Sequence, residues 1–159
     1  MNKDLTVENM QTRKILIFQE AHRIGAFNLA SVFPAFGKTE LICETDPAEL
    51  ELVADEKQIS QVMVNLVKNA FQATEHMEGA RVSIHSGLSN NGQPQITISD
   101  NGPGIPEDIL DKIFIPFFTT KENGSGIGLS LSRQIMQMHG GNLKVNSVPG
   151  KQTSVVLSF

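Results

Sequence analysis

The sequence predicts an α+β fold in which a mixed sheet packs against helices as a two-layer sandwich. Alternating apolar and polar residues mark strands that come in adjacent pairs, RVSIHSG with QITISD and NLKVNS with TSVVLSF. Other segments have apolar residues three and four positions apart, which indicates helices. The predicted order is helices, β-β-α-β-β, an irregular segment, then α-β-β. Such runs of neighbouring strands favour an α+β sandwich over an alternating parallel sheet.

Composition limits the chain to one ordinary core. It has 159 residues, of which 40% are hydrophobic and 19% are charged. The net charge of -4 and the lack of a dense basic run argue against nucleic acid as the main partner. No apolar run approaches the length of a membrane span, no signal-peptide pattern opens the sequence, and Cys43 is the only cysteine. We therefore expect a cytoplasmic chain without membrane contact, with Cys43 as a small core residue.

The first 37 residues have the least regular pattern. The apolar spacing from Leu5 to Leu29 suits one or two helices, and Pro34 and Gly37 break it. We expect residues 1–37 to be a helical lead-in, or the remnant of an upstream dimerisation region, and residues 38–159 to be the folded domain. ELICET and residues 49–55 are expected to be strands, joined by a turn at Asp46 and Pro47.

A long helix is predicted after Asp55. Asp55 is the expected N-cap, and Gln58 stands at the spacing of a capping box. Asn65, Asn69 and Gln72 are expected to stack on one face of this helix. The apolar face is predicted to contain Ile59, Val62, Met63, Leu66, Ala70 and Ala73.

The second half of the chain carries an irregular region between a strand and a helix. The strand QITISD ends in Asp100, and NGPGIP follows at once, with a short helix expected after Pro106. Phe114 and Phe117 are expected to pack in the core or at a hinge. The final helix is predicted from Leu129 to His139 and is ended by two glycines. His139 is expected only to complement the negative end of that helix.

The glycines of GSGIGLS do not fit the common phosphate-binding loops. Gly128 is followed by Leu129 and Ser130, whereas a Walker loop needs Gly-Lys-Ser/Thr. A dinucleotide fingerprint that begins at Gly124 and Gly126 needs a third glycine where Leu129 stands, and it needs a strand directly before it. Both interpretations therefore fail.

Four separate segments nevertheless predict a nucleotide site. Asn65 and Asn69 offer neutral amide oxygens, which suit Mg²⁺ already surrounded by phosphate oxygens and water. Asp100 could accept a hydrogen bond from the exocyclic amine of adenine. Lys121 could cap the terminal phosphates. Residues 124–128 could present backbone N-H groups at the positive end of the final helix.

These segments resemble a known family. NLVKNAFQAT, DNGPGIP, IFIPFFTTK and GSGIGLSLSRQIMQMHGG are similar to the N box, first glycine box, F box and second glycine box of sensor histidine kinases. These kinases belong to an ATPase superfamily that also contains gyrase, MutL and one class of heat-shock chaperone. The resemblance runs from about residue 38 to the end, with the boxes in the right order. PFFTTK and the short lid look most like kinases of the nitrogen-regulation type.

The resemblance implies a Bergerat-type ATP-binding fold, with a mixed sheet on three helices and an ATP lid that is mobile without nucleotide. Asn69 would be the main Mg²⁺ ligand assisted by Asn65, and Asp100 would hold adenine. Asn65 and Lys121 would be the catalytic residues. Thr153 would reach adenine through water, although Gln152 stands where the family commonly has glycine. The further residues that would contact ATP are Ala73, Gly102, Gly104, Ile105, Thr119, Thr120, Gly124, Ser125, Gly126, Ile127, Gly128 and Leu129.

The same resemblance implies γ-phosphoryl transfer to a histidine on a dimerisation hairpin, and then signalling to a response regulator. His22 is the only histidine in the helix-like N-terminal region, but Arg23 and not an acidic residue follows it. We therefore expect the acceptor histidine to lie outside this chain, in a parent protein that could be membrane-anchored. Two alternatives remain: a nucleotide-driven conformational ATPase, and an anti-sigma-type regulatory switch.

Overall fold

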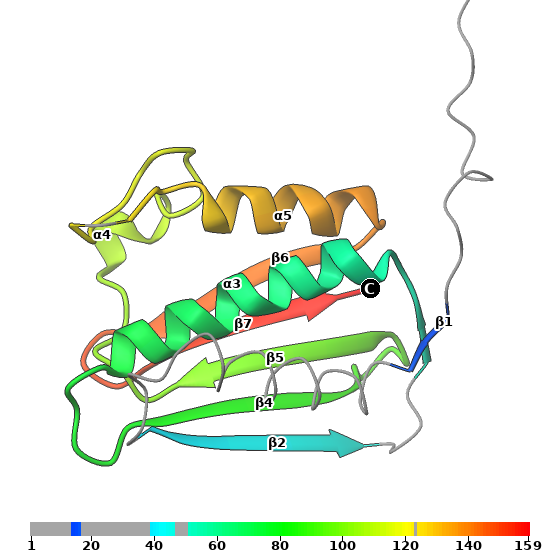
Figure 1. Cartoon of the computed structure of the whole chain (residues 1–159), viewed down its shortest axis with the longest axis horizontal. Helices are drawn as coiled ribbons and strands as arrows, with labels where there is room; N and C mark the ends of the chain where they lie inside the picture. The colour runs from blue at the N-terminus through cyan, green and yellow to red at the C-terminus, as the bar shows by residue number, and fades with distance from the viewer. Residues whose placement is uncertain (1–13, 17–38, 47–50, 123) are drawn as a thin grey trace, which may run out of the picture.

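A computed structural model describes residues 14–16, 39–46, 51–122 and 124–159 of the chain. Its main feature is a five-stranded sheet in the order β2-β4-β5-β7-β6 (Figure 1). Strand β2 (Glu40–Asp46) runs parallel to β4 (Arg81–Leu88). The remaining neighbours, β5 (Pro94–Asp100), β7 (Gln152–Ser158) and β6 (Asn142–Val148), pair antiparallel. The predicted mixed sheet is confirmed.

Two long helices, α3 (Glu56–Thr74) and α5 (Gly128–Met138), cover the sheet. Residues of both helices and of the strands form one hydrophobic cluster, so the helices pack on the same face. The short helix α4 (Glu107–Leu110) has four residues and none of them is buried. Figure 1 places α4 and the irregular segment after it near the start of α5. The two-layer α+β sandwich is confirmed, and its helical layer rests on α3 and α5.

The core follows from the periodicity of the sequence. The buried face of α3 includes Ile59, Val62, Leu66 and Ala70, at the predicted three-and-four spacing. Strands β4 and β5 alternate buried and more exposed residues, as expected for a sheet that is covered on one face. Burial of this apolar surface is the main force that holds helix and sheet together. Cys43 is half-buried against the cluster, as expected, and burial raises the pKa of its thiol.

The N-terminal part differs from the prediction where it is described. Lys14–Leu16 forms a strand, β1, which pairs antiparallel with β3 (Glu51–Val53). The helix expected from Leu5 to Leu29 is therefore wrong at these three positions, because backbone pairing with β3 decides the conformation. The rest of that helix, His22, the break at Pro34 and Gly37, and the turn after Asp46 lie outside the described residues.

The start of α3 is capped by two groups, one of them distant in sequence. The Asp55 carboxylate accepts a hydrogen bond from Gln58 N-H at 3.0 Å, so the predicted N-cap is confirmed. The reciprocal half of the capping box is wrong. Asp55 N-H donates to His139 Nε2 at 3.0 Å, and Gln58 Oε1 has no hydrogen-bond partner among the described residues. His139 Nδ1 lies 2.8 Å from the carbonyl oxygen of Ile135, so Nδ1 carries the proton and the ring is neutral. His139 therefore joins the end of α5 to the start of α3.

Candidate functional site

One face of α3 brings the predicted segments together. Asn65, Asn69 and Ala73 follow one another at four-residue spacing, which stacks them along the helix. Asn65 contacts α5, Asn69 contacts Lys121, and Ala73 lies against Gly102. Segments that are far apart in sequence therefore meet along a single helix.

Asp100 ends β5 and is buried, with 7% of its surface exposed. Its Oδ1 accepts a hydrogen bond from Gly102 N-H at 2.9 Å. Burial raises the pKa of this carboxyl group, and the backbone of Gly102 and Thr153 and the charge of Lys121 oppose the rise. A Cβ on Gly102 would collide with Asp100 Oδ1 and crowd Ala73, so only glycine fits there. A buried carboxylate with spare acceptor capacity is suited to bind a donor on a ligand.

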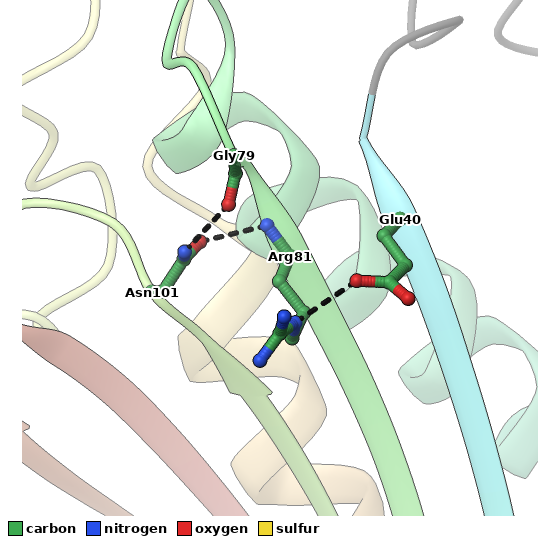
Figure 2. Close-up of polar contacts among 4 residues, drawn as sticks. All are labelled: Glu40, Gly79, Arg81 and Asn101. Carbon is green, nitrogen blue, oxygen red and sulfur yellow. Dashed lines mark hydrogen bonds and ion pairs between the residues drawn. The ribbon is translucent and has the colours of Figure 1, made fainter.

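Asn101 fixes the end of β5, and sequence reasoning missed this role. Figure 2 shows its side chain between two backbone groups: Nδ2 donates to Gly79 O at 2.9 Å, and Oδ1 accepts from Arg81 N-H at 2.7 Å. Arg81 in turn reaches Glu40 of β2, with Nε 3.0 Å from Oε2. Asn101 therefore holds the start of β4 beside the position where Asp100 leaves the sheet. An Asn-Gly pair is by itself typical of a turn, and the partners of Asn101 lie about twenty residues away in sequence, so no local pattern reveals them.

Lys121 reaches α3 although the residue as a whole is exposed. Its Nζ lies 3.2 Å from Asn69 Oδ1 and 2.7 Å from Gln72 Oε1. Burial of the ammonium group is the largest cause that lowers the pKa of Lys121, the charge of Lys68 lowers it further, and Asp100 opposes both. The Lys121 ammonium therefore lies against Asn69 Oδ1, one of the two amide oxygens that were predicted to bind a metal.

Asn65 contacts the start of α5. Its Nδ2 donates to Ser132 Oγ at 3.0 Å, and Ser132 is fully buried. A Cβ on Gly128 would collide with Asn65 Oδ1, so the glycine lets the first turn of α5 approach α3. Leu129, in that first turn, packs against the core. Ser132 is a second residue that sequence reasoning missed.

The segment from residue 119 to residue 127 has no helix or strand among its described residues. Lys121 N-H donates to Thr119 Oγ1 at 3.1 Å, and a Cβ on Gly124 would collide with the same oxygen. Ile127 N-H is 3.4 Å from Ser125 Oγ. Thr120 is exposed. The described residues of this segment therefore form a short loop with hydrogen bonds among its own polar groups.

Phe117 and Gly126 close this loop at its base. Phe117 N-H donates to Gly126 O at 2.9 Å, and a Cβ on Gly126 would collide with the Phe117 backbone. Both residues have positive φ, 68° for Phe117 and 67° for Gly126. The Phe117 side chain is 75% exposed, so the expectation that it packs in the core is wrong. Its left-handed backbone turns the side chain outward, whereas Phe114 packs on the core under Arg133, as expected.

Three further predicted site residues, Thr153, Gly104 and Ile105, lie where β6 and β7 meet the loop that follows β5 (residues 101–106). Thr153 is buried, with 8% of its surface exposed, and stands opposite Asp100 in the β5-β7 pair. Gly104 has a φ of 71°, and a Cβ there would collide with Val148 O. Ile105 N-H donates to Ser147 Oγ at 2.7 Å, a contact that sequence reasoning did not find.

Asp100 and Lys121 are the charged side chains among the predicted site residues, and the other polar side chains there are neutral. Among the described residues, no three His, Cys, Asp or Glu side chains gather to hold a metal. Asn65 and Asn69 therefore fit a cation that brings most of its oxygen ligands with it, as a nucleotide-bound Mg²⁺ does.

No helix in the described part of the chain is both long and apolar enough to cross a membrane.

Comparisons with known proteins identify related sequences and structures. Residues 54–159 match the family described as histidine kinase-, DNA gyrase B-, and HSP90-like ATPase. The chain is 34% identical over 120 residues to the sensory histidine kinase/phosphatase NtrB of Vibrio alginolyticus, covering 70% of this chain and 34% of that protein. It is 38% identical over 113 residues to the signal transduction histidine-protein kinase AtoS of Escherichia coli, covering 71% and 18%. The chain thus spans about a third or less of the length of these relatives.

Among solved structures, the chain resembles the catalytic domain of the histidine kinase ThkA. The TM-score is 0.80 and the sequence identity is 30%, with 94% of this chain and 95% of that chain covered. The fold therefore agrees with a catalytic domain of this kind.

Proposed function

Because the chain belongs to the family of histidine kinase-, DNA gyrase B- and HSP90-like ATPases, we propose that it is the ATP-binding catalytic domain of a sensor histidine kinase. It positions Mg-ATP so that the γ-phosphoryl group passes to a histidine on a dimerisation hairpin of the parent protein. A response regulator is the downstream partner, and the parent is cytoplasmic or membrane-anchored with this domain in the cytoplasm. The proposed domain is residues 38–159.

The observation that carries this proposal is the shared face of α3, along which Asp100 with Gly102, Lys121 and the start of α5 all meet. Asp100 accepts a hydrogen bond from the exocyclic amine of adenine. Gly102, Gly104 and Ile105 shape the pocket beside Ala73, and Thr153 completes it. The phosphates lie toward Lys121 and the start of α5, enclosed by Thr119, Thr120, Gly124, Ser125, Gly126, Ile127, Gly128 and Leu129.

Asn69 and Asn65 would hold Mg²⁺, and the bound ion would supply charge neutralisation on the phosphates. Lys121 must release Asn69 for that to happen, and its ammonium then caps the terminal phosphates instead. The amide of Asn65 orients groups but cannot take a proton from water. This favours phosphoryl transfer over the hydrolysis of a conformational ATPase. An anti-sigma-type switch would bind the nucleotide in the same way and would not phosphorylate a histidine.

Calorimetric titration of the 159-residue chain with ATP tests the site. Asp100→Asn should weaken ATP binding strongly, and chelation of Mg²⁺ should weaken ATP binding to the unmodified chain. Asn69→Ala should make binding weak and largely independent of Mg²⁺. Unchanged affinity in Asp100→Asn would count against the proposed adenine site.

Addition of a histidine-bearing hairpin in trans separates the three functions. Phosphohistidine on the hairpin supports the kinase, rapid phosphate release by the domain alone supports the ATPase, and nucleotide binding with neither supports the switch. We also expect trypsin to cut after Lys121 more slowly when ATP is present, because the lid becomes ordered on the phosphates.

A further inference from the structure

Three polar side chains stand in one row across the sheet. Asp100 of β5 is directly opposite Thr153 of β7, and Thr153 is directly opposite Ser147 of β6. Directly opposite residues project from the same face of a sheet. Asp100 and Thr153 belong to the proposed adenine site, whereas no role has been assigned to Ser147.

The protons of this row can be counted. A hydroxyl group has one proton and two lone pairs. Ser147 Oγ accepts from Ile105 N-H at 2.7 Å, lies 3.0 Å from Gln152 O and lies 3.2 Å from Thr153 Oγ1. A carbonyl oxygen cannot donate, so the Ser147 proton goes to Gln152 O. The hydrogen bond between the two hydroxyl groups then requires the Thr153 proton. Only this assignment satisfies all three contacts.

We propose that Ser147 is a positioning residue that holds the Thr153 proton away from the bound base and thereby sharpens selection of adenine over guanine. The inference rests on the adenine site proposed above. With its proton directed to Ser147, Thr153 Oγ1 presents only lone pairs beside the Asp100 carboxylate. Two neighbouring acceptors match the N6 amine of adenine, directly or through a bridging water. They oppose the O6 carbonyl of guanine, which is itself an acceptor.

The surroundings of Ser147 allow its hydroxyl to be removed without loss of the loop. Gly150 N-H donates to Pro103 O at 2.7 Å, so a backbone hydrogen bond still joins the loop after β5 to the β6-β7 turn. Asn146, the neighbouring residue of β6, is exposed and stands opposite Ser154 instead of Thr153. It offers a matched control on the same strand.

The test measures the affinities of ADP and GDP for the full 159-residue chain by calorimetry. Ser147→Ala should lower the preference for ADP over GDP by roughly 3- to 10-fold, as expected for one misdirected hydrogen bond. Ser147→Thr, which keeps the hydroxyl, should restore the preference, and Asn146→Ala should not change it. Thr153→Val should lower the preference similarly, and the double variant should lose no more than either single variant, because both act through one hydroxyl.

The outcomes separate this inference from the proposed function. If Ser147→Ala keeps the full preference for ADP while Asp100→Asn loses it, Ser147 has no positioning role and the adenine site stands. If Asp100→Asn also keeps the preference, the adenine site itself is wrong. If circular dichroism shows that Ser147→Ala is unfolded, Ser147→Cys carries the test, since a thiol of similar size is only a weak hydrogen-bonding group. A full preference for ADP in that variant likewise overturns the proposal.

Discussion

The Lys121 ammonium lies 3.2 Å from Asn69 Oδ1, the amide oxygen that we propose as the main ligand of Mg²⁺. The same ammonium is 2.7 Å from Gln72 Oε1, so it holds the loop from residue 119 to residue 127 against α3. In the proposed site, Lys121 and the metal would compete for this oxygen. Binding of Mg-ATP would then require the lysine to move from the helix to the phosphates.

Replacement of Lys121 by methionine should weaken ATP binding about 10-fold, because it removes a charge-assisted contact to phosphate at a partly exposed position. Calorimetric titration in the presence of Mg²⁺ measures the change. Lys112→Met is the matched control, since Lys112 is an exposed lysine outside the proposed site. The affinity of the Lys112→Met variant for ATP should be the same as that of the unmodified chain. Equal effects of the two substitutions would show that only net charge matters.

Asp100→Asn should stabilise the nucleotide-free domain while it weakens ATP binding. The carboxylate is buried, and an amide oxygen can still accept from Gly102 N-H. We expect a gain of roughly 0.5 to 2 kcal/mol in the free energy of unfolding at pH 7, as is common when function maintains an unfavourable group. Urea denaturation measures it. A loss of stability would mean that Asp100 has a compensating partner in the folded chain.

The pH dependence of stability gives a second test of Asp100. Burial raises its pKa above 3.8 in the folded state, so the folded carboxyl holds its proton to higher pH than the unfolded one. Between pH 3.8 and the raised pKa, the folded state therefore binds more protons than the unfolded state. The contribution of Asp100 to stability falls as the pH rises through this range. Asp100→Asn should remove this fall. An identical pH profile in both proteins would contradict the raised pKa.

Sequence reasoning succeeded where a pattern is local. The alternation of β4 and β5, the apolar spacing of α3 and the N-cap at Asp55 each depend on neighbouring residues, and all are confirmed. The four segments of the proposed site could be picked out because each carries its own local pattern, and the resemblance suggested their roles.

The missed features depend on contacts between distant residues. His139 accepts from Asp55 across 84 positions, and Ser132 pairs with Asn65 across 67. No local pattern identifies such partners. Phe117 is apolar and was expected inside, but its positive φ, fixed by the approach of Gly126, turns it outward. Strand β1 exists only through its pairing with β3.

Asn101→Ala should destabilise the domain by about 1 to 2 kcal/mol, because it leaves Gly79 O and Arg81 N-H without their side-chain partner. Glu40→Gln is the contrast. It alters the exposed ion pair with Arg81 in the same corner of the fold and should cost less than about 1 kcal/mol. Urea denaturation of both variants compares them. A larger effect of Glu40→Gln would show that the ion pair between β2 and β4 contributes more to stability than the Asn101 amide does.

His139→Phe should cost about 1 to 2 kcal/mol of stability, because Asp55 N-H at the start of α3 loses its acceptor in a partly buried place. Phenylalanine keeps a ring of similar shape. His76→Phe is the control, since the His76 side chain is 88% exposed, and it should be nearly neutral. Thermal unfolding of the three proteins measures the difference. If both variants unfold together with the unmodified chain, the contact between the two helices does not contribute to stability.

Gly126→Ala should weaken ATP binding as well as the fold, because two separate costs fall on this residue. Its φ of 67° is unfavourable for alanine, and the added Cβ would collide with the backbone of Phe117 at the base of the loop. Gly92→Ala isolates the first cost, since Gly92 has a φ of 76° and no atom within 4 Å of an added Cβ. Gly92→Ala should lose about 1 kcal/mol of stability and keep its affinity for ATP. Gly126→Ala should lose more stability and bind ATP more weakly, since the loop cannot keep its closed base. Equal stability losses with equal ATP affinity would show that the approach of Phe117 and Gly126 does not shape the nucleotide site.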